Sequence, residues 1–184
     1  QAHPDVDVVY TDYSEINDAG QVVRHCRVSP VEELAVQNCI GPSFLYRRAV
    51  HERVGGYAED LFLAEDYDFW LRASEHHQLE RLAVDCYLYR VHAGSLTARR
   101  ARDIEAARAQ AQFRNLARLH WMGTTTKAHA YLSLSLRLCR TDQVYLGRFY
   151  LRRAFGEFRI LEHDPEFAMR ELLYERPGVL RNSR

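Results

Sequence analysis

The segment FLAEDYDFWLR, residues 62–72, places three carboxylates within four positions, next to large aromatic side chains. From Glu65 onward the apolar residues follow helical spacing as far as His77. Acidic residues such as Glu65 and Asp66 are favoured at the start of a helix, because they interact with the positive end of its dipole. We therefore predict a helix that begins at Glu65 and follows directly on a loop.

Apolar and β-branched runs around this helix predict the strands of a sheet. The expected strands are residues 6–10, 21–28, 43–46 and 82–90. A helix start is predicted at Pro30, with Ser29 as its cap. A short helix over residues 48–54 is expected to end at Gly55-Gly56, because glycine adopts a left-handed conformation without a steric clash. Together these elements predict an α/β fold.

Beyond about Ala101 the pattern becomes all-helical. One stripe at helical spacing consists of Ala109, Phe113, Leu116, Ala117 and His120. Similar stripes over residues 128–139 and 144–158 predict a helical hairpin, and a final helix is expected over residues 164–173. We therefore predict an α/β region over residues 1–100 and a helical extension over residues 101–184.

The composition limits the classes of partner and compartment. Lys and Arg number 25, as do Asp and Glu, so the formal net charge is zero and nothing indicates nucleic acid as a partner. The four cysteines are too widely spaced for a zinc site or a redox motif, which favours a reducing, cytoplasmic setting. Cys39 and Cys86 are expected in the core. No run of about 18 apolar residues is present, so no transmembrane segment is predicted.

The acidic segment has two interpretations from its residues alone. In the first, it is a capped helix start whose carboxylates lie in water. In the second, one carboxylate is a general base beside an acceptor hydroxyl, since a helix N-terminus both presents such a base and favours its ionised form. Trp70 likewise either offers a flat apolar face to a ligand or is a half-buried core residue.

Five segments, taken in their order, resemble the second half of the GT-A catalytic domain of family 2 glycosyltransferases. They are DVDVVYTD at residues 5–12, IGPSFLYRR at 40–48, RVGGY at 53–57, AED at 64–66 and YLYRVHAGS at 87–95. The resemblance covers about half of the chain, and its specificity lies in the ordered set rather than in any one segment. It implies part of a Rossmann-like (GT-A) mixed sheet with flanking helices, followed by the helical extension.

The resemblance implies a catalytic role for the acidic segment. Asp66 corresponds to the catalytic base and Glu65 to the neighbour that shapes the acceptor side, where Trp70 would also lie. Gly55 and Gly56 correspond to a glycine loop that lets the backbone approach donor and acceptor. The implied mechanism inverts the sugar C1, because the acceptor hydroxyl attacks from the face opposite to the leaving nucleoside diphosphate.

The resemblance also implies where the donor binds. His92 corresponds to a late histidine that helps to hold a divalent metal, Mn or Mg, or the donor diphosphate, and Arg90 would assist with the phosphate charge. The nucleotide pocket and the main metal ligands are expected outside this chain, so the chain alone is not expected to transfer sugar. Asp5 and Asp7 have the spacing of a metal motif but are interpreted as a coincidental surface pair.

The implied partners are a nucleotide-sugar donor and a glycan or lipid-linked acceptor, as in polysaccharide biosynthesis. Six arginines between Arg137 and Arg159 form either a solvated helix face or a peripheral contact with the inner membrane face. An incomplete sheet has an exposed edge, which favours association of copies into a homo-oligomer. The alternative hypothesis is a helical protein-interaction module whose α/β part is a support, and it predicts an apolar groove between the helices.

Overall fold

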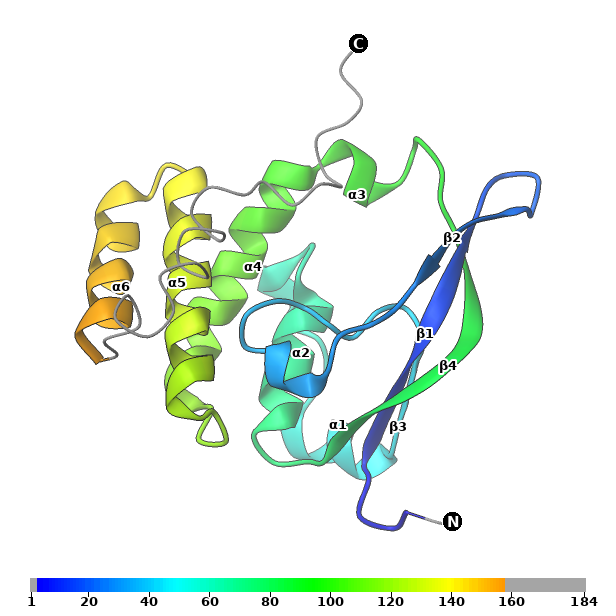
Figure 1. The fold of residues 1–184 in the computed structure, drawn as a ribbon, viewed down its shortest axis with the longest axis horizontal. Coiled ribbons are helices and arrows are strands. Elements are labelled where there is room, and N and C mark those ends of the chain that lie inside the picture. The colour runs from blue at the N-terminus through cyan, green and yellow to red at the C-terminus, as the bar shows by residue number, and fades with distance from the viewer. Residues whose placement is uncertain (1–2, 158–184) are drawn as a thin grey trace.

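A computed structural model describes residues 3–157 and shows a mixed α/β fold with a sheet of four strands (Figure 1). The strands are β1 (Val8–Ile16), β2 (Val22–Cys26), β3 (Phe44–Tyr46) and β4 (Leu79–Arg90). β1 pairs with β4 in parallel and with β2 and β3 antiparallel. Because β4 pairs along the whole of β1, β2 and β3 share its other edge. The sheet is therefore mixed, as predicted.

β1 extends six residues beyond the predicted end at Tyr10, to Ile16. The sequence pattern stops at Tyr10 because the following residues are largely polar. Their side chains are paired within the sheet. Arg81 binds the carboxylate of Asp12 at 2.9 Å and Arg24 binds that of Glu15 at 2.5 Å, so this half of the strand is accommodated without an apolar run.

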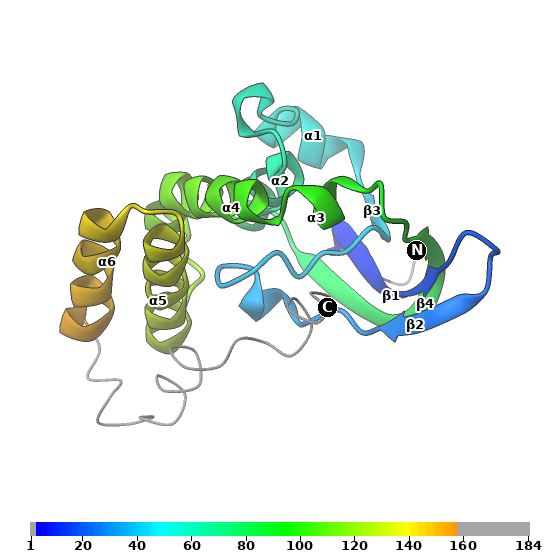
Figure 2. The same ribbon diagram turned by 90° about the horizontal axis from the view of Figure 1, so that it is seen from above.

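The helices are α1 (Arg48–Val54), α2 (Glu65–Ser74), α3 (Leu96–Arg99), α4 (Ala101–Asn115), α5 (Thr124–Arg140) and α6 (Val144–Glu157). Figures 1 and 2 show α2 between the sheet and α4, with α5 and α6 on the side away from the sheet. Residues 67–71 of α2 are all buried, so this helix is enclosed by the sheet on one side and by α4 on the other. The predicted helix over residues 164–173, like Arg159, lies outside the described residues.

The helix start predicted at Pro30 is correct only as a single turn, and the cap predicted at Ser29 is wrong. Only a 3₁₀ turn over Val31–Glu33 forms, and Ser29 makes no side-chain cap. The carbonyl of Ser29 instead accepts a hydrogen bond from the Tyr10 hydroxyl. The carbonyls after the turn are bound by side chains of other elements, so they are not available to propagate a helix.

The apolar stripe predicted for α4 is correct only in part. Ala109 and Leu116 are buried, but Phe113 is 49% exposed and His120 is also exposed. The buried positions beside them are polar, Gln112 and Asn115, and both make hydrogen bonds. A stripe defined by apolar residues could not reveal this face, because two of the side chains that fill it are amides.

One hydrophobic cluster runs from the sheet through α2 and α4 to α5, and includes Tyr10, Trp70, Ala109 and Leu134. The core is therefore continuous across residue 100, and the division into two regions there stays a prediction. Cys39 is buried as predicted, whereas the core position predicted for Cys86 is wrong because its side chain is exposed in β4. None of the helices in the described part of the chain is long and apolar enough to cross a bilayer.

Candidate functional site

Asp66 is held at the first turn of α2 by two hydrogen bonds. Its Oδ1 accepts the backbone N–H of Tyr67 at 2.7 Å, and its Oδ2 accepts the side-chain amide of Asn38 at 3.0 Å. The orientation of that amide is itself fixed, because Asn38 Oδ1 accepts the backbone N–H of Ile40 at 3.3 Å. Donors on both oxygens therefore fix the orientation of the carboxylate, which is half-buried at the positive end of a helix.

The surroundings of Asp66 make it a stronger base than an exposed aspartate. Burial raises the pKa of its carboxyl, while the Tyr67 N–H lowers it, Glu65 raises it, and the Asn38 amide and the charge of Arg108 lower it. The net direction is upward. A raised pKa moves a carboxylate toward the range in which general bases operate, and the hydrogen bonds keep its ionised form stable.

Glu65 precedes Asp66 and has an oxygen without a protein partner. Its Oε2 is buried, and none of the described residues makes a hydrogen bond to it. The backbone just before it is strained, because Leu63 has φ 79° without being glycine. An acceptor for hydrogen bonds thus lies beside Asp66, on a chain segment that is held in an unusual conformation.

The Gly55-Gly56 loop follows α1 and is fastened to α2. Gly55 has φ 78°, a conformation that favours glycine, as predicted for the end of this helix. Arg72 of α2 donates hydrogen bonds to the carbonyls of Val54 and Gly56, the latter at 2.8 Å. The residue after the glycines, Tyr57, brings its ring to 5.4 Å from that of Phe69.

Tyr57 connects this glycine loop with the acidic segment. The pKa of its hydroxyl is raised by burial first, and then by the charges of Tyr46, Asp66 and Glu65. The geometric link is the contact between the rings of Tyr57 and Phe69, since Phe69 belongs to the helix that begins with the two carboxylates. The structure therefore packs the residue that follows the two glycines against α2, the helix that carries Glu65 and Asp66.

Trp70 is fully buried, so its ring does not offer an open face in this structure. It packs edge-on against Phe44 at 4.8 Å and Tyr46 at 5.8 Å between ring centroids. Its indole nitrogen is buried, and no hydrogen-bond partner for it occurs in residues 3–157. The half-buried alternative was thus closer, and Trp70 anchors α2 to the sheet below Asp66.

Arg90 and His92 lie at the carboxyl end of β4 and just beyond it. Arg90 donates to the carbonyls of Asn17 and Asp18 at 2.7 and 2.9 Å, so its guanidinium binds the turn between β1 and β2. His92 is exposed in the loop that leads to α3. Within residues 3–157, neither Arg90 nor His92 makes a hydrogen bond or ion pair with Asp66.

The direction of α2 places its acidic N-terminus toward the end of the sheet where Arg90 and His92 lie. α2 runs opposite to β4, so its N-terminus lies toward the carboxyl end of that strand (Figure 1). The chain after His92 also returns to this region, because the Arg100 guanidinium lies over the ring of Phe62 at 5.8 Å from its centroid. In sheets with parallel strands, ligands bind outside the carboxyl ends of those strands.

The described residues alone do not form a metal site. No group of three or more His, Cys, Asp or Glu side chains comes together among them. His92 offers one ligand, which fits a contributing role but cannot hold an ion by itself. Asp7 is engaged elsewhere, because its carboxylate binds His77 Nδ1 at 3.0 Å and the Gln78 N–H at 3.4 Å. The prediction that the main ligands lie outside this chain is unaffected.

A hollow of about 620 Å³ adjoins the acidic segment. Phe62 and Leu63 line it from the loop before α2, and Phe113, Leu138 and Leu146 line it from α4, α5 and α6. Its lining by side chains of α4, α5 and α6 is of the kind that the interaction-module hypothesis predicts.

Sequence reasoning missed Asn38 and Arg108, which act on Asp66 from outside its own helix. Asn38 lies in an irregular segment and Arg108 in a helix rich in arginine, and neither has a pattern that singles it out. Comparison of the chain with models of protein families and with curated proteins gives no match.

Proposed function

We propose that this chain contains the base-bearing, acceptor-side half of an inverting glycosyltransferase of the GT-A type. The observation that supports this most directly is the geometry of Asp66, which is fixed by Asn38 and by the Tyr67 N–H and whose pKa is raised by burial. An acceptor hydroxyl would lose its proton to Asp66 while its oxygen attacks the sugar C1. The nucleoside diphosphate would leave from the opposite face with the bonding electron pair.

Each of the other site residues has a place in this proposal. The free Oε2 of Glu65 would accept a hydrogen bond from a second acceptor hydroxyl, which orients the nucleophile. Gly55 and Gly56 would let a substrate approach the backbone beside Tyr57. Arg90 and His92 would lie on the donor side, and the nucleotide pocket and the main ligands for Mn or Mg would be supplied from outside this chain.

The architecture is compatible with part of a Rossmann-like domain. β1 and β4 are parallel, and α2 lies on the sheet between them in the sequence and runs opposite to β4. A helix that runs opposite to a pair of parallel strands is an element of Rossmann-like folds, in which ligands bind at the carboxyl ends of those strands. In this chain the antiparallel strands β2 and β3 also lie between β1 and β4 in the sequence.

The decisive experiment replaces the base in the protein that includes the donor-binding half. Release of nucleoside diphosphate from a panel of nucleotide sugars would be measured with and without glycan and lipid-linked acceptors. Asp66→Asn is expected to lower kcat by about 10²-fold or more, the range typical of a general base. Asp60→Asn is the control. Asp60 lies six residues before Asp66 and is an exposed carboxylate that pairs with Arg114 at 2.5 Å. Transfer that persists in folded Asp66→Asn protein excludes Asp66 as the base.

A second candidate function is a protein-interaction module, which the hollow lined by Phe62 and Phe113 favours. Under that hypothesis Asp66→Asn leaves the function intact, whereas Phe113→Asp abolishes partner binding. The two variants therefore separate the two classes of function.

A further inference from the structure

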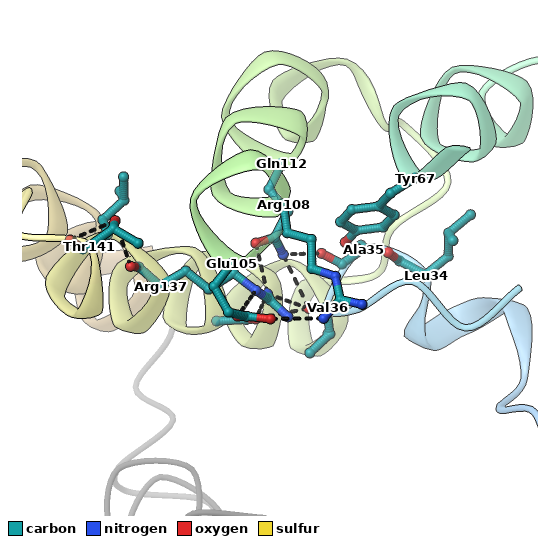
Figure 3. Close-up of polar contacts among 11 residues, drawn as sticks. Leu34, Ala35, Val36, Tyr67, Glu105, Arg108, Gln112, Arg137 and Thr141 are labelled. Carbon is teal, nitrogen blue, oxygen red and sulfur yellow. Dashed lines mark hydrogen bonds and ion pairs between the residues drawn. The ribbon is translucent and has the colours of Figure 1, made fainter. Parts of the chain in front are cut away.

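Three successive backbone carbonyls before Asn38 are each held by a side chain from a different helix (Figure 3). Tyr67 of α2 donates to Leu34 at 2.9 Å, Gln112 of α4 to Ala35 at 2.8 Å, and Ser133 of α5 to Val36 at 2.8 Å. These side chains are buried, so each bond replaces solvent at a carbonyl that no helix or strand pairs. The segment over residues 34–36 is thus fastened to three helices.

Arg137 of α5 reinforces this attachment. Its Nη1 donates to the Val36 carbonyl and to Gln112 Oε1, both at 2.9 Å, and also to Ser133. Its Nε binds Glu105 at 3.1 Å, and Glu105 in turn binds Arg108 at 2.8 Å. Burial alone would favour the neutral form of Glu105, but the charges of Arg137 and Arg108 outweigh it and lower the pKa of the carboxyl. Glu105 is therefore ionised at neutral pH, and its negative charge pairs with the positive charges of Arg108 and Arg137.

The fastened segment ends two residues before Asn38, the residue that donates to Asp66. A chain of direct contacts thus runs from α4 and α5 through the carbonyls of Ala35 and Val36 to the Asn38 amide and the candidate base. The Asn38 amide thus supplies a side-chain hydrogen bond to Asp66, beside the backbone N–H of Tyr67. A displacement of this segment would therefore alter the hydrogen bond between the Asn38 amide and the Asp66 carboxylate.

We propose that Gln112, Ser133 and Arg137 are positioning residues for Asp66, because they hold the segment that keeps the Asn38 amide on its carboxylate. The catalytic meaning of this inference rests on the proposed function. The relay itself, from Gln112, Ser133 and Arg137 through Asn38 to Asp66, can be tested without any substrate. It gives the helical region a role in setting the ionisation and orientation of the base.

Two members of the relay are uncharged, which makes a clean test. The charged and titratable groups that act on Asp66 are Glu65 on its own helix, Tyr57 after α1 and Arg108 on α4. Gln112→Met and Ser133→Ala change none of these charges. Any effect that they have on the ionisation of Asp66 therefore comes from a change of position, either of Asn38 or, through Arg137 and Glu105, of Arg108. The double variant with Asn38→Ala separates the two routes.

Ser135→Ala is the matched control. Ser135 is also buried in α5, two residues from Ser133, but its hydroxyl donates to the Gly147 carbonyl at 2.8 Å and not to a carbonyl of the 34–36 segment. The two substitutions remove the same hydroxyl from the same helix. Thermal unfolding of both variants would show how far each one alters stability.

The experiment is a titration of the Asp66 carboxyl by ¹³C NMR in the 184-residue chain. We expect Asn38→Ala, Gln112→Met and Ser133→Ala each to raise the pKa of Asp66, because each weakens a hydrogen bond that stabilises the ionised form. Ser135→Ala is expected to leave it unchanged. The double variant Asn38→Ala/Ser133→Ala should show no larger rise than Asn38→Ala alone, since both act through the same amide.

The proposal is overturned if Gln112→Met and Ser133→Ala leave the Asp66 titration where Ser135→Ala leaves it. It is equally overturned if Asn38→Ala does not raise the pKa of Asp66. The proposed function is tested separately, because transfer retained in Asp66→Asn protein would remove the catalytic role and leave the relay intact. If both hold, Ser133→Ala lowers kcat and moves the acidic limb of its pH profile upward, and Ser135→Ala does neither.

Discussion

The guanidinium of Arg72 binds the carboxylate of Asp68 one turn earlier in α2, at 2.8 Å, while its other nitrogens hold the glycine loop. Asp68 also accepts the side-chain amide of Asn115 of α4 at 2.8 Å. This pair thus joins the end of α1, α2 and α4 through one buried carboxylate. Asp68 is therefore not the solvated helix-start residue of the first interpretation, although it belongs to the same acidic segment.

Removing the arginine of this pair is expected to destabilise the fold strongly. Arg72→Met leaves Asp68 buried with a single neutral partner and frees two carbonyls of the glycine loop. Loss of one partner from a buried ion pair costs about 3–5 kcal/mol. Urea unfolding of the variant measures this. Arg48→Met is the control, because Arg48 pairs with Glu52 on the surface and is expected to change stability by less than about 0.5 kcal/mol. Similar losses in both variants would contradict the structural role of the Arg72–Asp68 pair.

The two glycines are expected to respond differently to alanine. Gly55 has φ 78° and ψ −172°, a region in which a side chain is strained, whereas a Cβ at Gly56 would meet only His51 Cε1 at 3.7 Å. Gly55→Ala should lower the unfolding free energy by about 1–3 kcal/mol and Gly56→Ala by less than about 0.5 kcal/mol. Chemical denaturation of the two variants measures both changes in unfolding free energy. An equal cost at both sites would mean that the loop does not need its left-handed residue.

The sequence predicts those elements whose residues form a local pattern. The helix that begins at Glu65 and the turn at Gly55 follow from helix-end chemistry, and both are present. The second half of β1 was not predicted, because its polar residues are matched only by partners far away in the chain, such as Arg81 for Asp12. Pairing at that sequence separation is not visible in a local window.

The same limit applies to the candidate site. Asp66 and Glu65 stand out because acidic residues at a helix start form a recognisable pattern, whereas Asn38 becomes part of the site only through the tertiary fold. Gln112 appears as a polar position in a helix and is in fact fully buried. An amide is compatible with both environments, so its burial depends on the carbonyls that the 34–36 segment presents to it.

The raised pKa of Asp66 predicts a pH-dependent stability difference between the native protein and Asp66→Asn. Burial is the main cause, and the folded state therefore binds the proton more tightly than the unfolded chain. The stability that this group contributes is present below its unfolded pKa and is lost as the pH rises through its folded pKa. Asp66→Asn lacks this loss, so its stability relative to the native protein should increase from pH 3 to pH 7.

Urea unfolding at several pH values measures that difference. Asp60→Asn serves as the control with the opposite sign, because its hydrogen bond with Arg114 lowers the pKa of the Asp60 carboxyl. That variant should become less stable relative to the native protein over the same pH interval, if only slightly, since Asp60 is exposed. A difference for Asp66→Asn that does not vary with pH would contradict the upward direction of its pKa.

The free edge of β4 predicts self-association of the isolated chain. In the described part of the chain this strand of 12 residues pairs with β1 alone, and its apolar side chains are largely exposed, with Leu88 at 61%. A long apolar edge strand can pair with a second copy, and a lysine on it opposes such pairing. Sedimentation velocity over a concentration series should show association for the native chain and less for Leu88→Lys.

Tyr145→Lys controls for the loss of an exposed apolar group, because Tyr145 is 91% exposed on α6 and lies outside the sheet. If Tyr145→Lys reduces association and Leu88→Lys does not, the contact lies on the helices, as the interaction-module hypothesis expects.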